Sequence, residues 1–274
     1  MSLLARRFLL VLAVLPALAL IVAAARAASP RFVFPGSRAV GGEHRVPAGF
    51  DLITAGACDG VVVHALDLPA SPGARTVVHF HNNRDTAADA ADLARSLHAR
   101  GLGVLLVEYR GYGLSRGSEP SEEGLYNDAE AALDGLAARG VGPDQVVLWG
   151  TSLGTGVAAE MARRGRGAAL VLVTPYTSLP DVVTAAVPLF PAGLFLANRF
   201  DTMGKTDEIR VPTLVIHGDA DEIVPFWMGS RLASAIPGAR LLQVKGGHHG
   251  DLFLRERERL LSAISALCLG ARSG

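Results

Sequence analysis

Short apolar runs alternate with longer amphipathic stretches along most of this chain. The apolar runs are typical of buried parallel strands and lie at residues 76–80, 104–107, 145–149, 169–174, 213–216 and 241–244. Stretches with apolar residues at helical spacing lie among them, at about 86–100, 121–136, 153–164 and 251–267. This alternation predicts an α/β fold, with a mostly parallel sheet covered by helices on both faces.

Two β-branched runs precede this alternation. Residues 51–54 and 60–68 flank a Cys-Asp-Gly turn and predict an antiparallel pair of strands. Residues 31–48 show no periodicity, and we interpret them as an exposed lead-in. We expect one domain over residues 31–274, since 274 residues are enough for one well-filled core.

Residues 1–30 have the pattern of a targeting segment. Arg6 and Arg7 are followed by an apolar stretch, residues 8–25, and by a small-residue cleavage motif, Ala-Arg-Ala, at residues 25–27. The pattern predicts export with cleavage. An uncleaved membrane anchor formed by residues 8–25 is the alternative, because the stretch is long enough to span a bilayer. Either case places the body of the protein outside the cytoplasm, in a periplasmic or extracellular space.

The pentapeptide Gly150-Thr151-Ser152-Leu153-Gly154 joins a predicted strand to a predicted helix. A G-x-S-x-G sequence in this context is the nucleophile-elbow signature of a serine hydrolase. The two glycines remove side chains that would collide in so tight a turn. Ser152 would then lie at a helix N-terminus, where backbone N–H groups favour a developing oxyanion. An ordinary glycine-rich turn is the alternative.

The segment 175–209 interrupts the strand–helix alternation. Its run 187–196 is too apolar for a plain loop, and the segment is too short for a separate domain. We interpret it as a small lid over the active site, made of one or two short helices. A buried connecting helix is the alternative.

Composition narrows the possible partners. The chain has 26 basic and 26 acidic residues, and without a basic face a nucleic-acid partner is not expected. The spacing of Cys and His indicates no metal site, so no cofactor is expected. Export would allow Cys58 and Cys268 to pair, but they lie near opposite ends of the domain, and we favour two unpaired thiols.

A nucleophilic serine needs a base and an acid that orients it, and in this architecture they follow the serine as acid and then histidine. Asp219 and Asp221 follow the strand at 213–216, and His248 and His249 follow the strand at 241–244. The order is therefore met, and each position has two candidates.

Several motifs together resemble the α/β-hydrolase superfamily, and within it a short-lid group of serine hydrolases that includes membrane-associated lipid hydrolases and protein depalmitoylases. They are the segments 109–115, 120–125, 150–156 and 217–225 and the pair Gly247-His248. The resemblance extends over roughly residues 49–268. It implies that Asp221 is the acid, with Asp219 as competitor, and that His248 is the base because a Gly precedes it, with His249 as alternative.

Two backbone N–H groups are expected to bind the oxyanion. One belongs to Leu153, and the resemblance places the other at Asn83, in the loop after the strand at 76–80. Similar proteins usually have Gly where this chain has Asn82, a departure that affects the loop. His79 and His81 lie on one face of the strand and are interpreted as structural support for the loop.

These features predict a metal-independent serine hydrolase that forms an acyl-enzyme on Ser152. The apolar lid and the leader favour a small-molecule or lipid acyl substrate: a carboxylester, a lipid ester or a thioester. A serine peptidase of the same fold is one alternative, and it would use carboxylates such as Asp181 or Glu222 to hold an amino group. A non-catalytic binding protein is the other.

Overall fold

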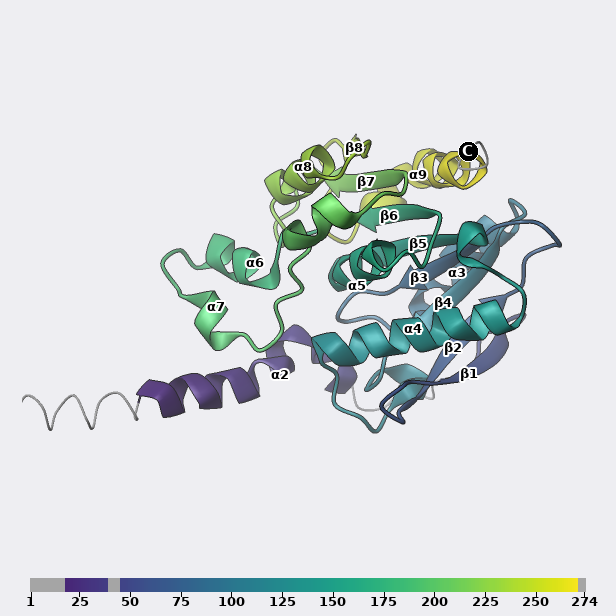
Figure 1. Cartoon of the computed structure of the whole chain (residues 1–274). Coiled ribbons are helices and arrows are strands. Elements are labelled where there is room, and N and C mark those ends of the chain that lie inside the picture. The colour runs from purple at the N-terminus through teal and green to yellow at the C-terminus, as the bar shows by residue number, and fades with distance from the viewer. Residues whose placement is uncertain (1–17, 39–44, 271–274) are drawn as a thin grey trace, which may run out of the picture.

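The computed structural model describes residues 18–38 and 45–270. One eight-stranded sheet forms the centre, in the order β1-β2-β4-β3-β5-β6-β7-β8 (Figure 1). Its strands are β1 (Asp51–Gly56), β2 (Val62–Leu68), β3 (Thr76–Phe80), β4 (Gly103–Glu108), β5 (Val146–Thr151), β6 (Ala169–Val173), β7 (Thr213–Gly218) and β8 (Arg240–Val244). The pairs β1–β2 and β2–β4 are antiparallel, and the other pairs are parallel. The predicted α/β fold is confirmed.

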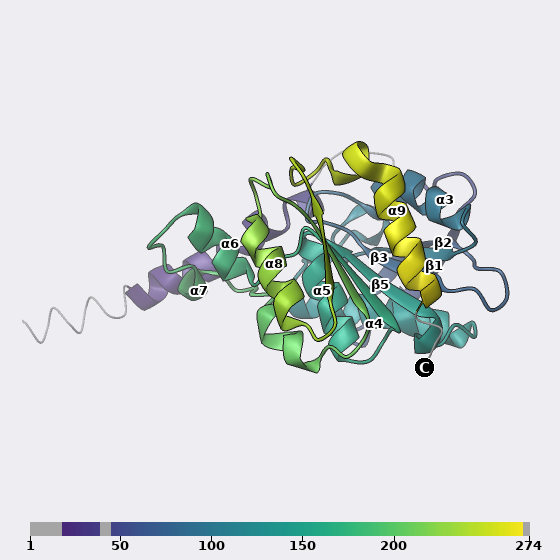
Figure 2. The ribbon, with the colours of Figure 1, turned by 90° about the horizontal axis from the view of Figure 1, so that it is seen from above.

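Helices cover both faces of the sheet, as Figures 1 and 2 show. On one face lie α4 (Glu122–Ala138), α5 (Leu153–Arg163) and α8 (Phe226–Ala235), and on the other lie α3 (Ala91–His98) and α9 (Leu252–Gly270). Each face has its own apolar core, because successive strand residues point to opposite sides: Val78 packs with the first set of helices and Val77 with the second.

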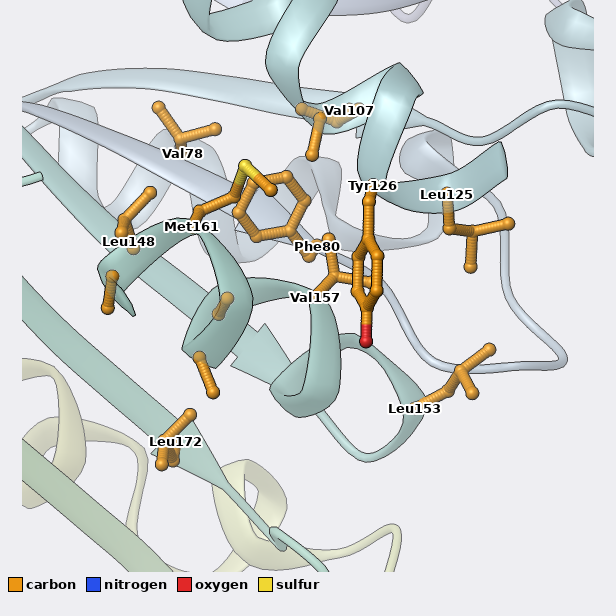
Figure 3. Packing of buried hydrophobic residues seen from close by; sticks show 14 of the residues in the cluster. Val78, Phe80, Val107, Leu125, Tyr126, Leu148, Leu153, Val157, Met161 and Leu172 are labelled. Atoms are coloured by element: carbon orange, nitrogen blue, oxygen red, sulfur yellow. The ribbon is translucent and has the colours of Figure 1, made fainter. Parts of the chain in front are cut away.

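Helix α5 contributes many side chains to the first core. Val157 and Met161 of α5 pack beside Tyr126 of α4 and against Val78 and Phe80 of β3 (Figure 3). These side chains are buried, so α5 is fixed on the sheet directly behind the turn that carries the predicted nucleophile.

The segment 175–209 contains α6 (Leu179–Ala186), α7 (Ala192–Phe195) and the 3₁₀ helix η5 (Met203–Glu208). Helices α6 and α7 project from the body, beside the described start of the chain (Figure 1). Val187, Leu189 and Leu194 are exposed, so a buried connecting helix is not what forms here. The segment does contain two short α-helices, and its role as a lid stays a prediction.

The interpretation of residues 31–48 as an exposed lead-in is wrong for its first part. Residues 18–28 are helical and continue into α2 (Pro30–Val33) and the 3₁₀ helix η1 (Pro35–Arg38). Phe34 is fully buried and its ring meets Phe200 edge to face, with centroids 6.3 Å apart. Burial of a large aromatic side chain is favourable in free energy, and this holds even in a segment without apolar periodicity.

The first half of the predicted targeting segment, with Arg6 and Arg7, lies outside the described residues. In the ranges 18–38 and 45–270, no helix combines the length and the apolar character needed to cross a membrane.

Candidate active site

The turn between β5 and α5 has the geometry of a nucleophile elbow. Ser152 has φ 50° and ψ −115°, a backbone conformation that a non-glycine residue seldom adopts. A Cβ at Gly150 would collide with the backbone of Gly154, and a Cβ at Gly154 would collide with the carbonyl of Phe80 on β3. Both glycines are therefore required by close backbone contacts, as the sequence predicted.

Ser152 belongs to a continuous chain of hydrogen bonds. Its Oγ lies 2.9 Å from Nε2 of His249, and Nδ1 of His249 lies 2.8 Å from Oδ2 of Asp221. The other carboxylate oxygen of Asp221 accepts the backbone N–H groups of Ile223 (2.9 Å) and Val224 (2.8 Å). The three side chains come from the ends of β5, β7 and β8, at one edge of the sheet.

The carboxylate of Asp221 is kept ionised. Its burial acts to raise its pKa, but hydrogen bonds from His217, His249 and Val224 outweigh this effect and hold the pKa well below the usual value of 3.8. An ionised acid in this position fixes the ring of His249 and leaves Nε2 toward the serine.

The sequence-based choice of His248 is corrected by this geometry. Nδ1 of His248 lies 3.1 Å from Oε2 of Glu222, and both side chains are largely exposed at the rim. The backbone N–H of His248 donates to Asp251 (2.7 Å), which fixes the loop so that His248 faces the rim and the next residue, His249, faces Ser152. The glycine before His248, on which the sequence-based choice rested, does not indicate which of the two histidines faces Ser152.

The competing acid, Asp219, has a different place. Its carboxylate accepts the side-chain amide of Gln243 (2.8 Å) and the backbone N–H of Gly246 (2.5 Å). These hydrogen bonds, that of Gln243 foremost, lower its pKa. Asp219 thus holds the loop after β8, while Asp221 contacts the histidine.

Both expected oxyanion donors line the same cavity as Ser152. Among the described residues, the backbone N–H groups of Leu153 and Asn83 have no hydrogen-bond acceptor within the protein. Asn82, in the place of the usual Gly, uses its side-chain oxygen to accept the N–H groups of Arg84 (2.8 Å) and Asp85 (2.9 Å). This Asx-type turn shapes the loop without a glycine.

Aromatic and histidine side chains lie beneath this loop. The hydroxyl of Tyr112 donates to the carbonyl of Asn83 (3.0 Å), and that of Tyr109 donates to the carbonyl of His81 (3.3 Å). Burial lowers the pKa of His79 to about 3, so that its ring is neutral, and its Nε2 lies 3.1 Å from Oγ1 of Thr151. The arrangement is that of support for the loop, which matches the interpretation of both histidines.

The cavity at Ser152 and His249 has a volume of about 670 Å³. Polar groups of Asn82, Arg84, Asp85 and Glu222 lie in part of its wall. The rest is mostly apolar and comes from the N-terminal segment, α6, the end of α7, the loop after β7 and the start of α9: Phe32, Val33, Leu179, Val182, Val183, Leu196, Ile223, Val224, Leu252 and Phe253.

Sequence reasoning missed Phe32 and Val33, which form part of this wall. The available signal was a cluster of aromatic and aliphatic residues, from Phe32 to Phe34, in a stretch otherwise taken as exposed. Asp181, considered for a peptidase, is not in the wall, and its carboxylate accepts the hydroxyl of Thr177 (2.7 Å).

No group of three or more His, Cys, Asp or Glu side chains suited to a metal ion occurs in the part of the chain that the structure describes. Cys58 is exposed, Cys268 is buried, and both are free thiols.

Comparisons with known proteins identify similar sequences. The family described as "Serine aminopeptidase, S33" matches residues 71–202, and the one described as "TAP-like protein" matches residues 196–265. An uncharacterised protein of Mycobacterium tuberculosis is 36% identical over 223 residues, which is 80% of this chain and 79% of that protein. Alpha/beta hydrolase domain-containing protein 17C of Xenopus tropicalis is 34% identical over 203 residues, 71% of this chain and 63% of its own length.

Solved structures share the fold. An esterase of Pyrococcus furiosus superposes with a TM-score of 0.68 at 17% identity, over 82% of this chain and 91% of its own. An esterase of Exiguobacterium antarcticum superposes with a TM-score of 0.64 at 20% identity, over 79% of this chain and 98% of its own. The sheet, the elbow and these matches show that the chain belongs to the α/β-hydrolase superfamily and is by family a hydrolase.

Proposed function

We propose that the protein is a serine hydrolase that cleaves a carboxylester, a lipid ester or a thioester through an acyl-enzyme on Ser152. The observation that carries this proposal is the hydrogen-bonded chain from Ser152 through His249 to Asp221, which opens into a largely apolar cavity. In this proposal the hydrogen-bonded chain provides the nucleophile and its base, and the apolar cavity favours the kind of acyl group.

The chemistry follows from these contacts. Oγ of Ser152 attacks the acyl carbon while Nε2 of His249 accepts its proton, and Asp221 stabilises the imidazolium that results. The negative oxygen of the tetrahedral intermediate accepts the N–H groups of Leu153 and Asn83. His249 then donates its proton to the leaving alcohol or thiol. Water, activated by the same histidine, attacks the acyl-enzyme in the reverse manner and releases the acid.

The wall of the cavity favours an acyl chain over a peptide. Its apolar side chains on α6 and the N-terminal segment match a hydrocarbon, and burial of each CH₂ contributes about 0.8 kcal/mol. A peptidase acting on a free amino terminus needs a carboxylate directed at the amino group. Asp181 is bound elsewhere. The two carboxylates in the wall already have partners, since Glu222 contacts His248 (3.1 Å) and Asp85 accepts the side-chain amide of Asn82 (2.6 Å). The family description as an aminopeptidase is therefore the weaker guide to the substrate.

A fluorophosphonate probe tests the activated serine. We expect the wild type to be labelled and Ser152→Ala to remain unlabelled, with the same far-UV circular dichroism. Labelling that persists in Ser152→Ala would place the nucleophile elsewhere. A folded wild type that is neither labelled nor active on a broad ester panel, but captures a partner, would support a non-catalytic binding protein.

A series of p-nitrophenyl esters of increasing chain length tests the acyl preference. We expect kcat/KM to rise with chain length until the cavity is filled. Activity confined to short polar esters or to aminoacyl amides would contradict the preference for an acyl chain and favour a peptidase.

We also propose that the body is exported, with residues 8–25 as a retained membrane anchor in the alternative case. The positive, apolar and small-residue order of residues 1–30 supports this. Mass spectrometry of the protein from fractionated cells tests it: a mature chain beginning at residue 28 outside the cytoplasm is expected, and an uncleaved cytoplasmic chain would refute it.

A further inference from the structure

The N-terminal strap, defined here as residues 29–38, is firmly attached to the body. Its first residue, Ser29, accepts the backbone N–H of Ala197 with its hydroxyl (3.0 Å). Phe34 is fully buried against Phe200. The strap is therefore held at the segment before η5 and reaches the loop after β3, at the edge of the sheet where Ser152 lies.

The strap makes two hydrogen bonds to one residue of that loop. The N–H of Gly36 donates to the carbonyl of Asn83 (3.0 Å), and the side-chain amide of Asn83 donates to the carbonyl of Val33 (3.1 Å). From the other side, the hydroxyl of Tyr112 donates to the same carbonyl of Asn83 (3.0 Å). Three hydrogen bonds thus fix Asn83, and no acceptor for its backbone N–H occurs within residues 18–38 and 45–270.

The contact at Gly36 is too close for a side chain. A Cβ there would lie 2.6 Å from the carbonyl oxygen of Arg84 and 2.8 Å from the ring of Tyr112. No positive φ occurs at Gly36, so the reason for glycine here is the close approach of strap and loop. The fit is specific to this place, because an Ala would push the two apart.

We propose that the N-terminal strap is a positioning element for the oxyanion donor of Asn83. This inference rests on the proposed function. Donors of an oxyanion hole act because they are already directed at the oxygen before the reaction, and a misplacement of about 1 Å costs about 100-fold in rate. Strap and Tyr112 hold the peptide of Asn83 in that orientation, while Phe32 and Val33 of the same strap complete the cavity wall.

Three variants of the full-length chain test this role. Gly36→Ala separates strap and loop, Asn83→Ala removes the bond to Val33 and keeps the backbone N–H, and Tyr112→Phe removes one hydroxyl. Gly135→Ala, on α4 with no atom near its Cβ, is the matched control. For each, kcat and KM are measured on one ester, with thermal unfolding and the inhibition constant of a trifluoromethyl ketone that forms an oxyanion on the serine.

We expect kcat to fall about 10- to 100-fold in the three variants, with much smaller changes in KM. The inhibition constant should rise in parallel with the loss of kcat/KM, because the ketone uses the same donors. Gly135→Ala should keep the kcat, KM and inhibition constant of the wild type, and its melting temperature should not fall. A merely structural strap would lower the melting temperature without this parallel change.

Wild-type kcat in folded Asn83→Ala and Tyr112→Phe would overturn the inference. These two variants decide the question if Gly36→Ala does not fold. The failure of the proposed function gives another result: the wild type itself would then show no labelling that depends on Ser152. A labelled wild type with fully active variants would leave the proposed function intact and refute only the role of the strap.

Discussion

Nε2 of His249 lies 2.9 Å from Oγ of Ser152, although 97 residues separate them in the chain. The parallel strands β5 and β8 bring them together, because their carboxyl ends lie at the same edge of the sheet. The neighbouring His248 contacts Glu222 and faces away from the serine. The two adjacent histidines therefore provide a direct comparison.

We expect His249→Ala to lower kcat on an ester by about 10⁴-fold or more, since the proposed general base is lost. His248→Ala should keep kcat within about threefold, because an exposed pair of this kind contributes about 1 kcal/mol or less. Stopped assays with a p-nitrophenyl ester measure both variants. Loss of activity in His248→Ala alone would restore the sequence-based choice and refute the arrangement described here.

The close packing of the elbow on β3 predicts the effect of a single methyl group. A Cβ at Gly154 would collide with the carbonyl of Phe80, so we expect Gly154→Ala to lower the free energy of unfolding by about 1–3 kcal/mol and to abolish labelling of Ser152. Gly135→Ala, in open space on α4, should raise the free energy of unfolding by about 0.5–1 kcal/mol, because Ala has a higher helix propensity than Gly. Urea denaturation compares the two, and equal stability would contradict the contact.

The lowered pKa of Glu160, on α5, leads us to expect that the stability of the protein depends on pH. Its burial acts to raise its pKa, but hydrogen bonds from Arg163, Arg164 and Lys205 outweigh burial and lower it from 4.5 to about 2. Because the folded pKa is the lower one, the contribution is complete above about pH 4.5 and is lost as the pH falls toward 2. We expect Glu160→Gln to lower the free energy of unfolding by about 2 kcal/mol at neutral pH.

The same difference should shrink as the pH falls below about 4.5, when the carboxyl groups of the unfolded chain become protonated. Urea denaturation of both proteins over a pH series measures it. Glu258→Gln, which removes an exposed partner of Arg100, is the control and should change stability by less than about 1 kcal/mol. A pH-independent effect of Glu160→Gln would show that packing, and not charge, is responsible.

Because α6 lines the cavity, we expect a substitution on this helix to change the substrate preference. Val182 lines the cavity, whereas Val187, just beyond the helix, is exposed and outside the wall. We expect Val182→Trp to lower kcat/KM for long acyl esters about tenfold while short esters are retained, because the added ring fills space that the chain needs. Val187→Trp should leave the ratio of long to short esters unchanged. An unchanged ratio in both variants would place the acyl chain elsewhere.

The sheet was predictable because each strand has its own local signature. Helix α8 was missed, and its residue Gly229 shows why: a Cβ there would collide with the ring of His217, so packing places a poor helix former in the helix interior. The burial of Phe34 was missed for a related reason, because it depends on a partner, Phe200, that no local pattern reveals.

The geometry of the candidate site was predictable to the level of residue type and order, and the roles of its residues stay predictions. The elbow determines Ser152 through sterics, and Asp221 follows its strand at the expected place. The choice between His248 and His249 depends on the backbone of one loop, which Asp251 fixes by a hydrogen bond. Neighbouring residues of equal chemistry cannot be distinguished by spacing alone.

The order of the three residues along the chain has a consequence for biosynthesis. Ser152 and Asp221 are translated well before His249, which follows β8, the last strand of the sheet. A chain that is still being translated has the serine without this histidine, so the proposed triad can form only after nearly the whole sheet has been synthesised.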